Sequence, residues 1–313
     1  MKQTRRDFLT TTSRTAIAVA LLESCQAAPE PIIDIHQHLN YSGRPDDALI
    51  RHQKLMGATT TILLPAGRSV NTASTHEGVA NGLQAQALGN EACRNFAHAH
   101  SREYRFGANE VPDVPDATKE IERYLKDDGV LIAEQKFGVE CDSAAMQNIY
   151  AVARERRVPV LMHWQYKMYN YGFDRFDKIL EKYPGVIFLG HAQTWWANID
   201  KSYRDDEKNL YPKGPVTPGG LTDRYLSDYP NMFGDLSAGS GQNALTRDEA
   251  FARDFLTRHQ NKLIFGSDCS DSEGAGEKCI GATTIATFRR LAASKEIERK
   301  LLYGNAKKVF RRL

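Results

Sequence analysis

The stretch Ile32-Ile33-Asp34-Ile35-His36-Gln37-His38 is an apolar run that ends in two histidines two residues apart. The run suits a buried β-strand, in which residues two apart point to the same side. His36 and His38 would therefore project together from the end of this strand, at a spacing that lets both imidazoles reach one divalent ion. Two histidines with ordinary surface or core roles are the alternative.

Seven more apolar runs follow, and polar amphipathic stretches typical of helices separate them. The runs are residues 59–65, 105–110, 130–137, 158–164, 186–192, 232–237 and 262–268, and helices are expected over 45–56, 116–128, 143–157, 173–183 and 246–260. Alternating strands and helices imply parallel strands joined by helical crossovers. Eight such units in about 280 residues predict an α/β protein with a (β/α)8 TIM barrel, whose typical length is about 250 residues. A doubly wound open sheet is the alternative, but no glycine-rich phosphate turn follows the first run.

Single polar residues end three of the later runs: His163, His191 and Asp268. In a (β/α)8 barrel the carboxyl ends of the strands meet at one mouth, where active sites lie. One buried histidine is usually an ordinary core residue. Four histidines and an aspartate at the same end of one barrel are hard to explain by packing alone, so the sequence predicts a site there.

These motifs resemble the amidohydrolase superfamily, and specifically its amidohydrolase-related branch, which holds aminocarboxymuconate-semialdehyde decarboxylase, resorcylate decarboxylases and several lactonases. The resemblance covers residues 31–313. It rests on Asp34-Ile-His36-Gln-His38, Met162-His163-Trp164, Leu189-Gly190-His191-Ala192, Phe265-Gly266-Ser267-Asp268 and Leu301-Leu302-Tyr303-Gly304-Asn305-Ala306.

The resemblance implies roles for the five residues. His36, His38 and His163 match metal ligands, and Asp268 matches a carboxylate that binds or adjoins the metal and takes the proton of the attacking water. His191 matches a histidine that ligates the metal, polarises the substrate or shuttles a proton. Such a donor set suits a divalent metal ion, for which we expect Zn²⁺, with Mn²⁺ or Fe²⁺ as alternatives.

Glu134 and Lys136 lie two residues apart in the fourth run and share a face. In some branches of the superfamily a glutamate or carboxylated lysine here bridges two metals, so Glu134 is a candidate ligand of a second metal. A salt-bridged pair inside the barrel is the alternative. One metal is the base expectation.

Other residues are candidates for roles around the metal. Asp235 ends the seventh run and could orient a ligand. The long connection over residues 194–221 is aromatic and is interpreted as a lid or pocket wall. Aromatic side chains could hold a ring, and cationic ones a carboxylate; the candidate substrate-binding residues are Lys136, Trp164, Trp195 and Arg224, and the pocket could also include Tyr166 and Trp196.

The predicted function is metal-dependent hydrolysis, in which an activated water attacks a lactone, ester or amide of a small organic substrate. The alternative is a metal-dependent, non-oxidative decarboxylase of a small aromatic or unsaturated acid. A third interpretation is an exported binding protein that kept the barrel and lost catalysis.

Residues 1–28 read as a signal peptide, which leaves residues 29–313 for the barrel. Arg5-Arg6 precedes Phe8-Leu9, as in a twin-arginine signal, and an apolar run over 15–22 follows. That run is too short to span a bilayer, which needs roughly 20 residues. We expect an exported, periplasmic protein with no stable membrane insertion after leader removal; lipidation of Cys25 is the alternative.

The net charge of the mature chain limits the classes of partner that are expected. The chain has 41 basic and 39 acidic residues, and residues 1–25 hold four and two of them, so 37 of each remain. No net field then attracts nucleic acid or an anionic membrane, and a small-molecule partner is expected.

Four cysteines remain after Cys25, and none forms a CxxC pair, so no thiolate zinc site is expected. Cys269 and Cys279 could form a disulfide or stay free thiols.

Overall fold

The computed structural model describes residues 30–66, 86–311 and 313. The predicted leader and Cys25 lie outside the described residues. Residues Pro31–Leu313 form one compact unit. Its strands are β1 (Ile33–Gln37), β2 (Thr60–Leu63), β3 (Tyr104–Phe106), β4 (Ile132–Gln135), β5 (Val160–His163), β6 (Phe188–His191), β7 (Met232–Asp235) and β8 (Leu263–Ile264).

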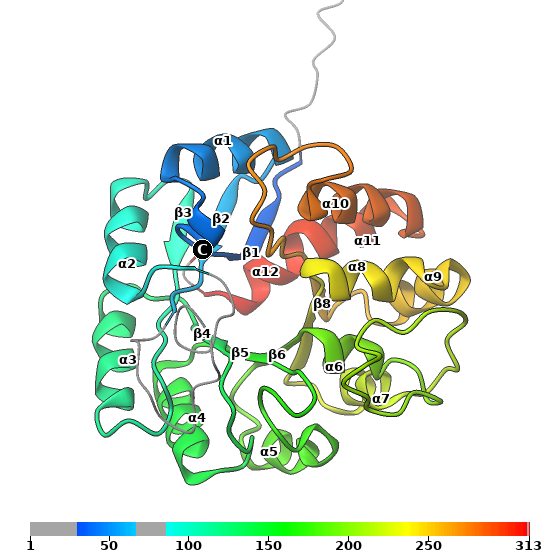
Figure 1. Cartoon of the computed structure of the whole chain (residues 1–313), viewed down its shortest axis with the longest axis horizontal. Helices are drawn as coiled ribbons and strands as arrows, with labels where there is room; N and C mark the ends of the chain where they lie inside the picture. Colours follow the sequence, from blue (N-terminus) through cyan, green and yellow to red (C-terminus); the bar gives the residue numbers. More distant parts are fainter. Residues whose placement is uncertain (1–29, 67–85, 312) are drawn as a thin grey trace, which may run out of the picture. The chain divides into compact units, whose positions relative to one another are not determined.

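The strands close into a ring. Every pair of neighbours is parallel, in the orders β1-β2-β3 and β4-β5-β6-β7-β8. The two groups meet where the amide of Ala108 donates to the carbonyl of Leu131 at 2.9 Å. At the other junction the amide of Ile35 donates to the carbonyl of Phe265 at 3.3 Å. The predicted (β/α)8 barrel is therefore confirmed, and within this unit the helices surround the strands (Figure 1).

The helices fall between the strands, as the sequence pattern predicts. They are α1 (Asp46–Met56), α2 (Asn90–Ala99), α3 (Ala117–Lys126), α4 (Ala144–Arg156), α5 (Asp177–Lys182), α6 (Gln193–Ala197), α7 (Leu221–Asp228), α8 (Ala238–Thr246), α9 (Glu249–Arg258), α10 (Ile280–Leu291), α11 (Lys295–Arg299) and α12 (Asn305–Val309). Local chemistry sets several ends. Ser143 caps α4 by accepting from the Met146 amide at 3.3 Å, and Gly57 ends α1 at a φ of 90°. Within the described residues, no helix has the length and hydropathy that a membrane crossing requires.

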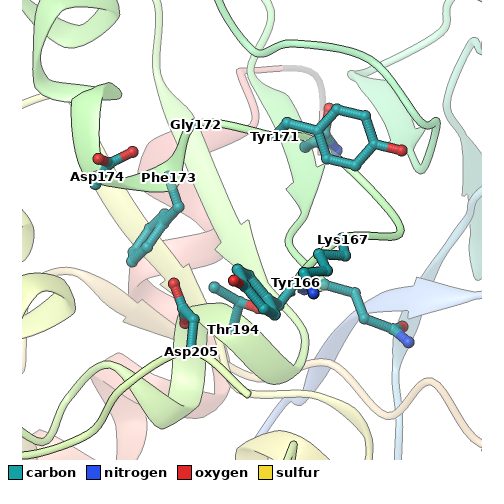
Figure 2. A pocket seen from close by; sticks show the side chains of 10 residues that line it. Tyr166, Lys167, Tyr171, Gly172, Phe173, Asp174, Thr194 and Asp205 are labelled. Carbon is teal, nitrogen blue, oxygen red and sulfur yellow. Dashed lines mark hydrogen bonds between the residues drawn. The ribbon is translucent and has the colours of Figure 1, made fainter. Parts of the chain in front are cut away.

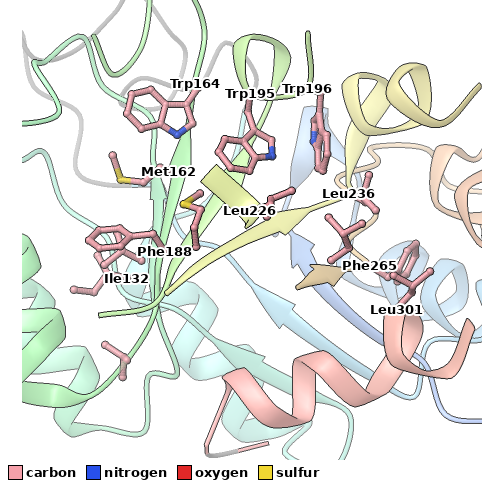
Figure 3. Packing of buried hydrophobic residues seen from close by; sticks show 14 of the residues in the cluster. Ile132, Met162, Trp164, Phe188, Trp195, Trp196, Leu226, Leu236, Phe265 and Leu301 are labelled. Atoms are coloured by element: carbon pink, nitrogen blue, oxygen red, sulfur yellow. The ribbon is translucent and has the colours of Figure 1, made fainter. Parts of the chain in front are cut away.

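Two apolar layers hold the barrel together. An inner cluster fills the ring with side chains from opposite strands, such as Ile33, Leu161 and Phe233. An outer cluster lies between strands and helices and includes the three tryptophans, whose packing Figure 3 shows. The alternation of strand side chains produces these layers, because successive residues point to opposite faces.

Candidate metal centre

Irregularities in β1 and β4 aim side chains into the barrel mouth. Ile33 and Ile35 both belong to the inner cluster, so strict alternation would turn His36 outward. The pairing of β1 with β2 shifts register between Asp34 and Gln37, and the pairing of β4 with β5 shifts between Ile132 and Gln135. Such bulges re-aim side chains next to active sites. They bring His36 and Glu134 into the mouth.

Four ligand atoms gather around one point. The Nε2 atoms of His36 and His38 each lie 3.6 Å from Oε2 of Glu134. The same two nitrogens lie 3.6 and 3.7 Å from Oδ1 of Asp268. Atoms bound about 2 Å from one ion in different directions are spaced about 3.3 Å apart in a tetrahedral site. This first group of donors has nearly that spacing.

The other carboxylate oxygen of Glu134 faces two more histidines. Its Oε1 is hydrogen-bonded to Nδ1 of His163 and lies 3.7 Å from Nε2 of His191. That nitrogen of His191 also lies 3.6 Å from Oδ2 of Asp268. Glu134 therefore lies between two pairs of histidines, His36 with His38 from β1 and His163 with His191 from β5 and β6. His163, predicted to join the strand-one pair directly, lies on the far side of Glu134 instead.

The rear nitrogens of the histidines are held by other groups. Nδ1 of His36 donates to Oδ2 of Asp235 at 2.7 Å, and Nδ1 of His38 donates to the Leu64 carbonyl at 2.7 Å. Ser237 donates to the same Asp235 oxygen at 2.9 Å and contacts Nδ1 of His191 at 2.9 Å. Metal-binding histidines are oriented in this way. Sequence analysis anticipated Asp235 but missed Ser237, although Ser237 stands two residues after it.

The donor set fits a divalent metal. Nε2 of His36 and Oδ1 of Asp268 are buried and have no hydrogen-bond partner in the described part of the chain. Buried polar atoms are rarely left without partners unless something else binds them. Imidazole and carboxylate donors suit zinc, manganese and iron alike. The geometry accommodates a divalent ion.

The electrostatics favour positive charge at the centre. Burial lowers the pKa of His38 to about 4 and also lowers the pKa of His163 and of His191, so these rings stay neutral near pH 7. Burial acts on His36 too, but the negative charges of Asp268 and Asp235 outweigh it and raise its pKa well above the ordinary value. His36 therefore binds a proton at the place where a metal cation would lie.

Asp34 joins the first strand to the last. Its Oδ1 accepts from the amides of His36 at 3.1 Å and Ser267 at 2.8 Å, and its Oδ2 accepts from Nε2 of Gln53 at 2.8 Å. Gly266 leaves room for this arrangement, because a Cβ there would lie 2.6 Å from Oδ1 of Asp235. The spacing of the ligands from β1 and β8 is thus fixed by these hydrogen bonds and by the absence of a side chain at Gly266.

Other polar side chains surround the ligands. Tyr41, which sequence analysis did not select, packs edge-on against His38 with ring centroids 4.9 Å apart, and the charge of Asp268 raises the pKa of its phenol. Lys136 is half-buried, with Nζ 5.3 Å from the ring centre of Tyr169. Burial raises the pKa of the Glu134 carboxyl, but the hydrogen bond from His163 and the positive charge of Lys136 outweigh it and hold that pKa well below its ordinary value. Lys136 therefore lies near Glu134, beside the mouth.

A cavity of about 430 Å³ adjoins the metal centre. Gln165 lines it, and Oε1 of Gln165 lies 3.5 Å from Nε2 of His163. Figure 2 shows the aromatic and charged side chains around this cavity. Its labelled lining residues are Tyr166, Lys167, Tyr171, Gly172, Phe173, Asp174, Thr194 and Asp205. The cavity includes none of the histidines of the metal centre and none of its carboxylates.

Three predicted substrate contacts are wrong. Trp164 follows His163 on β5, so it points outward and packs on Phe173 and Phe176 in the outer cluster. Trp195 is fully buried against the outer face of β6, where a Cβ on Gly190 would lie 2.3 Å from its ring. These positions are visible in Figure 3.

The remaining correction concerns Arg224, which is exposed on α7. The buried side of that helix carries Thr222 and Tyr225 instead, so the Arg224 side chain faces solvent. The segment 194–221 is only partly a pocket wall. It begins in α6, whose two tryptophans belong to the core, whereas Thr194 and Asp205 do line the cavity.

A family model described as Amidohydrolase matches residues 33–312. The chain belongs to this amidohydrolase family. The suspected resemblance is thereby confirmed, and enzymes of the family include both hydrolases and decarboxylases. A search of curated proteins found no match for this chain.

Solved structures share its fold. A candidate 2-pyrone-4,6-dicarboxylic acid hydrolase of Pseudomonas putida is 15% identical, with a TM-score of 0.59 over 91% of this chain and 99% of that one. The 2,6-dihydroxybenzoate decarboxylase of Rhizobium is 11% identical, with a TM-score of 0.54 over 90% and 99%. The 5-carboxyvanillate decarboxylase of Novosphingobium aromaticivorans, complexed with manganese, is 13% identical, with a TM-score of 0.52 over 84% and 79%. Identities this low show the barrel that this chain shares with these proteins and not its reaction.

Proposed function

We propose that this protein is a metal-dependent hydrolase of a lactone, ester or amide in a small organic substrate. The observation that carries the proposal is the carboxylate of Glu134, whose two oxygens face two different pairs of histidines. A carboxylate so placed suits two metal ions rather than the single ion expected from the sequence. Paired ions are typical of hydrolytic sites, where they act on both the attacking and the leaving oxygen.

A bound metal would contribute to hydrolysis in two ways. A divalent ion bound by these residues would act as a Lewis acid towards a carbonyl and make water acidic enough to react near neutral pH. Zinc is our first choice, with manganese or iron as alternatives, since all three accept imidazole and carboxylate donors.

Asp268 is the proposed general base. Its Oδ1 is buried without a hydrogen-bond partner in the described part of the chain, and it faces the nitrogens of His36 and His38. A carboxylate in this position accepts the proton of the attacking water and returns it to the leaving group. Tyr41, close to this carboxylate, keeps its own proton because the charge of Asp268 raises the pKa of the phenol.

His191 and Lys136 are proposed to hold the substrate. Burial lowers the pKa of His191 well below the ordinary value, so its ring is neutral. Its Nε2 faces Glu134 at 3.7 Å and Asp268 at 3.6 Å, where it can bind a metal or contact the substrate. Ser237 fixes its ring from behind at 2.9 Å. Lys136 supplies positive charge beside the mouth, which suits a substrate carrying a carboxylate.

Decarboxylation of a small aromatic or unsaturated acid is the second candidate. The observation in its favour is the same Lys136, because a cation beside a metal centre would hold the carboxylate that is lost. Two of the similar structures described above are decarboxylases.

An isotope experiment separates the two reactions. The purified enzyme would be screened against lactones and aryl acids, and turnover of a substrate would be run in ¹⁸O-labelled water. Hydrolysis places one labelled oxygen in the new carboxylate and releases no carbon dioxide. Release of carbon dioxide without label in the product would overturn the proposed hydrolysis.

Metal analysis tests the role of Glu134. Removing both His36 and His38 by substitution with alanine should abolish metal in the mouth, whereas Glu134→Gln should lower the content there by one ion per chain. Normal content in the double variant would remove the basis of the proposal. An unchanged content in Glu134→Gln would return the site to one metal.

A further inference from the structure

A second group of ligand-type side chains lies on the outer side of the barrel, behind β1 and β8. It consists of His52 on α1, Cys269 and Asp271 in the loop after β8, and Cys279 at the start of α10. His52 and Cys279 are fully buried, and Cys269 is 4% exposed. Sequence analysis expected no thiolate zinc site, since the two cysteines are ten residues apart.

The four ligand atoms converge. Nε2 of His52 lies 3.2 Å from Sγ of Cys269, 3.3 Å from Sγ of Cys279 and 3.1 Å from Oδ2 of Asp271. The two sulfur atoms lie 3.9 Å apart. All four atoms fall within 4.8 Å of one another.

These spacings match a tetrahedral zinc site. Zinc binds sulfur at about 2.3 Å and nitrogen or oxygen at about 2.0–2.2 Å, which separates two sulfurs by about 3.8 Å and a sulfur from a nitrogen by about 3.5 Å. A disulfide would need the sulfurs at about 2.05 Å, roughly half their present separation. A disulfide would also give no reason for His52 and Asp271 to point at the same place.

The surrounding contacts hold the loop in this arrangement. Arg44 donates to the carbonyls of Cys269 at 2.9 Å and Asp271 at 2.8 Å. Oδ1 of Asp271 accepts from the amides of Glu273 and Gly274 at 2.9 and 3.0 Å, which leaves Oδ2 directed at His52. Ligands oriented by such outer hydrogen bonds are typical of built metal sites.

The start of α10 contributes a backbone amide to the group. Sγ of Cys279 accepts from the Ala282 amide at 3.4 Å at the start of α10. A hydrogen bond from an amide at the start of a helix stabilises a negatively charged sulfur. The thiolate is the form that binds metal.

We propose that His52, Cys269, Asp271 and Cys279 form a closed structural zinc site that fastens the loop after β8 to α1. Four protein donors leave no open position for a substrate, as in other structural zinc sites. The site does not depend on the reaction at the mouth. Because Cys269 directly follows Asp268, the ion would also fix the backbone that carries the proposed general base.

Cobalt substitution tests the proposal on the full chain. The mouth offers no sulfur ligand, so thiolate-to-cobalt charge-transfer absorption in the near ultraviolet reports this second site alone. We expect the band in the cobalt-loaded wild type and in the His36→Ala, His38→Ala variant. We expect its loss in Cys279→Ser and its retention in Cys141→Ser, which removes a buried thiol elsewhere in the barrel. A cobalt-loaded wild type without the band would overturn the proposal.

Wild-type protein gives a second test that does not depend on the folding of any variant. X-ray absorption at the zinc edge should show sulfur neighbours at about 2.3 Å. Intact mass under non-reducing conditions should show all cysteines reduced. A zinc spectrum with nitrogen and oxygen neighbours only, or a mass that reveals a Cys269–Cys279 disulfide, would contradict the site.

Discussion

Asp268 adopts a backbone conformation that few side chains use, with a φ of 45°. Aspartate tolerates this left-handed region better than most residues, and such strain is common at functional sites. The conformation is held by the amide of Asp268, which donates to the carbonyl of His36 at 2.8 Å. It directs the carboxylate back over the strand-one histidines.

Replacing this carboxylate tests its role as a base. Asp268→Asn keeps the size and the backbone preference but not the basicity, so turnover should fall by about 10²–10⁴-fold. Metal content should fall less, because the histidines and Glu134 remain. Steady-state kinetics and metal analysis would be run on the same samples. Asp47→Asn, which changes an exposed aspartate of α1, is the control, and a variant at 268 as active as this control would exclude the role.

The polar residues at the strand ends could be selected from the sequence, because each one ends an apolar run that is expected to be buried. A polar residue that ends an apolar run needs a partner, and this pointed to His163, His191 and Asp268. Tyr41 was not predicted, because it lies in an irregular turn after β1, where side chains follow neither the strand nor the helix periodicity. Trp164 was wrongly predicted to line the pocket, because it follows His163 directly and adjacent residues of a strand face opposite ways.

At the level of elements, α6 lies close against β6. Gly190 makes this contact, since a Cβ there would lie 2.3 Å from the ring of Trp195. Gly190→Ala should therefore destabilise the fold by about 1–3 kcal/mol, as overpacked cores do. Urea unfolding would measure the loss. Gly185→Ala is the matched control, because a Cβ at this exposed glycine meets nothing within 4 Å. Equal midpoints for the two variants would disprove the tight contact.

A buried carboxylate ties α7 to α9. Asp223 accepts from Nη1 of Arg258 and contacts Nε2 of His259, both at 2.6 Å. Burial raises the pKa of Asp223, but these partners outweigh it and lower the pKa to about 2. The lowered value stabilises the fold above pH 4, and the contribution disappears as pH falls through about 2.

Asp223→Asn should accordingly cost about 1 kcal/mol at pH 7, after allowance for solvent screening. The difference in unfolding free energy from wild type should shrink between pH 4 and pH 2. Denaturant unfolding at several pH values would follow it. A cost that stays constant down to pH 2 would mean that packing, and not charge, is lost.

Element types were readable from periodicity, but local deviations were not. The expected helix over residues 246–260 is α9 with a shorter start, because Asp248 caps it by accepting from the Phe251 amide at 3.1 Å. The bulges in β1 and β4 are not visible in the hydrophobic pattern of the sequence. They nevertheless direct the side chains of His36 and Glu134 into the barrel mouth. They depend on pairing with neighbouring strands, which a single segment does not contain.

For the whole molecule, we propose export in a folded state. Arg5-Arg6 before Phe8-Leu9 motivates the proposal. Replacing both arginines by lysine should leave the protein in the cytoplasm, because the twin-arginine route requires the pair. Fractionation of cells followed by immunoblotting would measure this. Unchanged recovery from the periplasm would remove the twin-arginine assignment.

The bond from Asp34 to Ser267 has a consequence for synthesis. Its two ends are 233 residues apart, and the mouth needs residues from both. A growing chain on the ribosome therefore exposes His36 and His38 long before Asp268 exists to face them. Joining such distant segments is slow, since the entropy of closing the loop must be overcome before any contact repays it. Newly made chains should accordingly acquire metal at the mouth only after release, and pulse-labelled nascent chains stalled before residue 260 should bind none there.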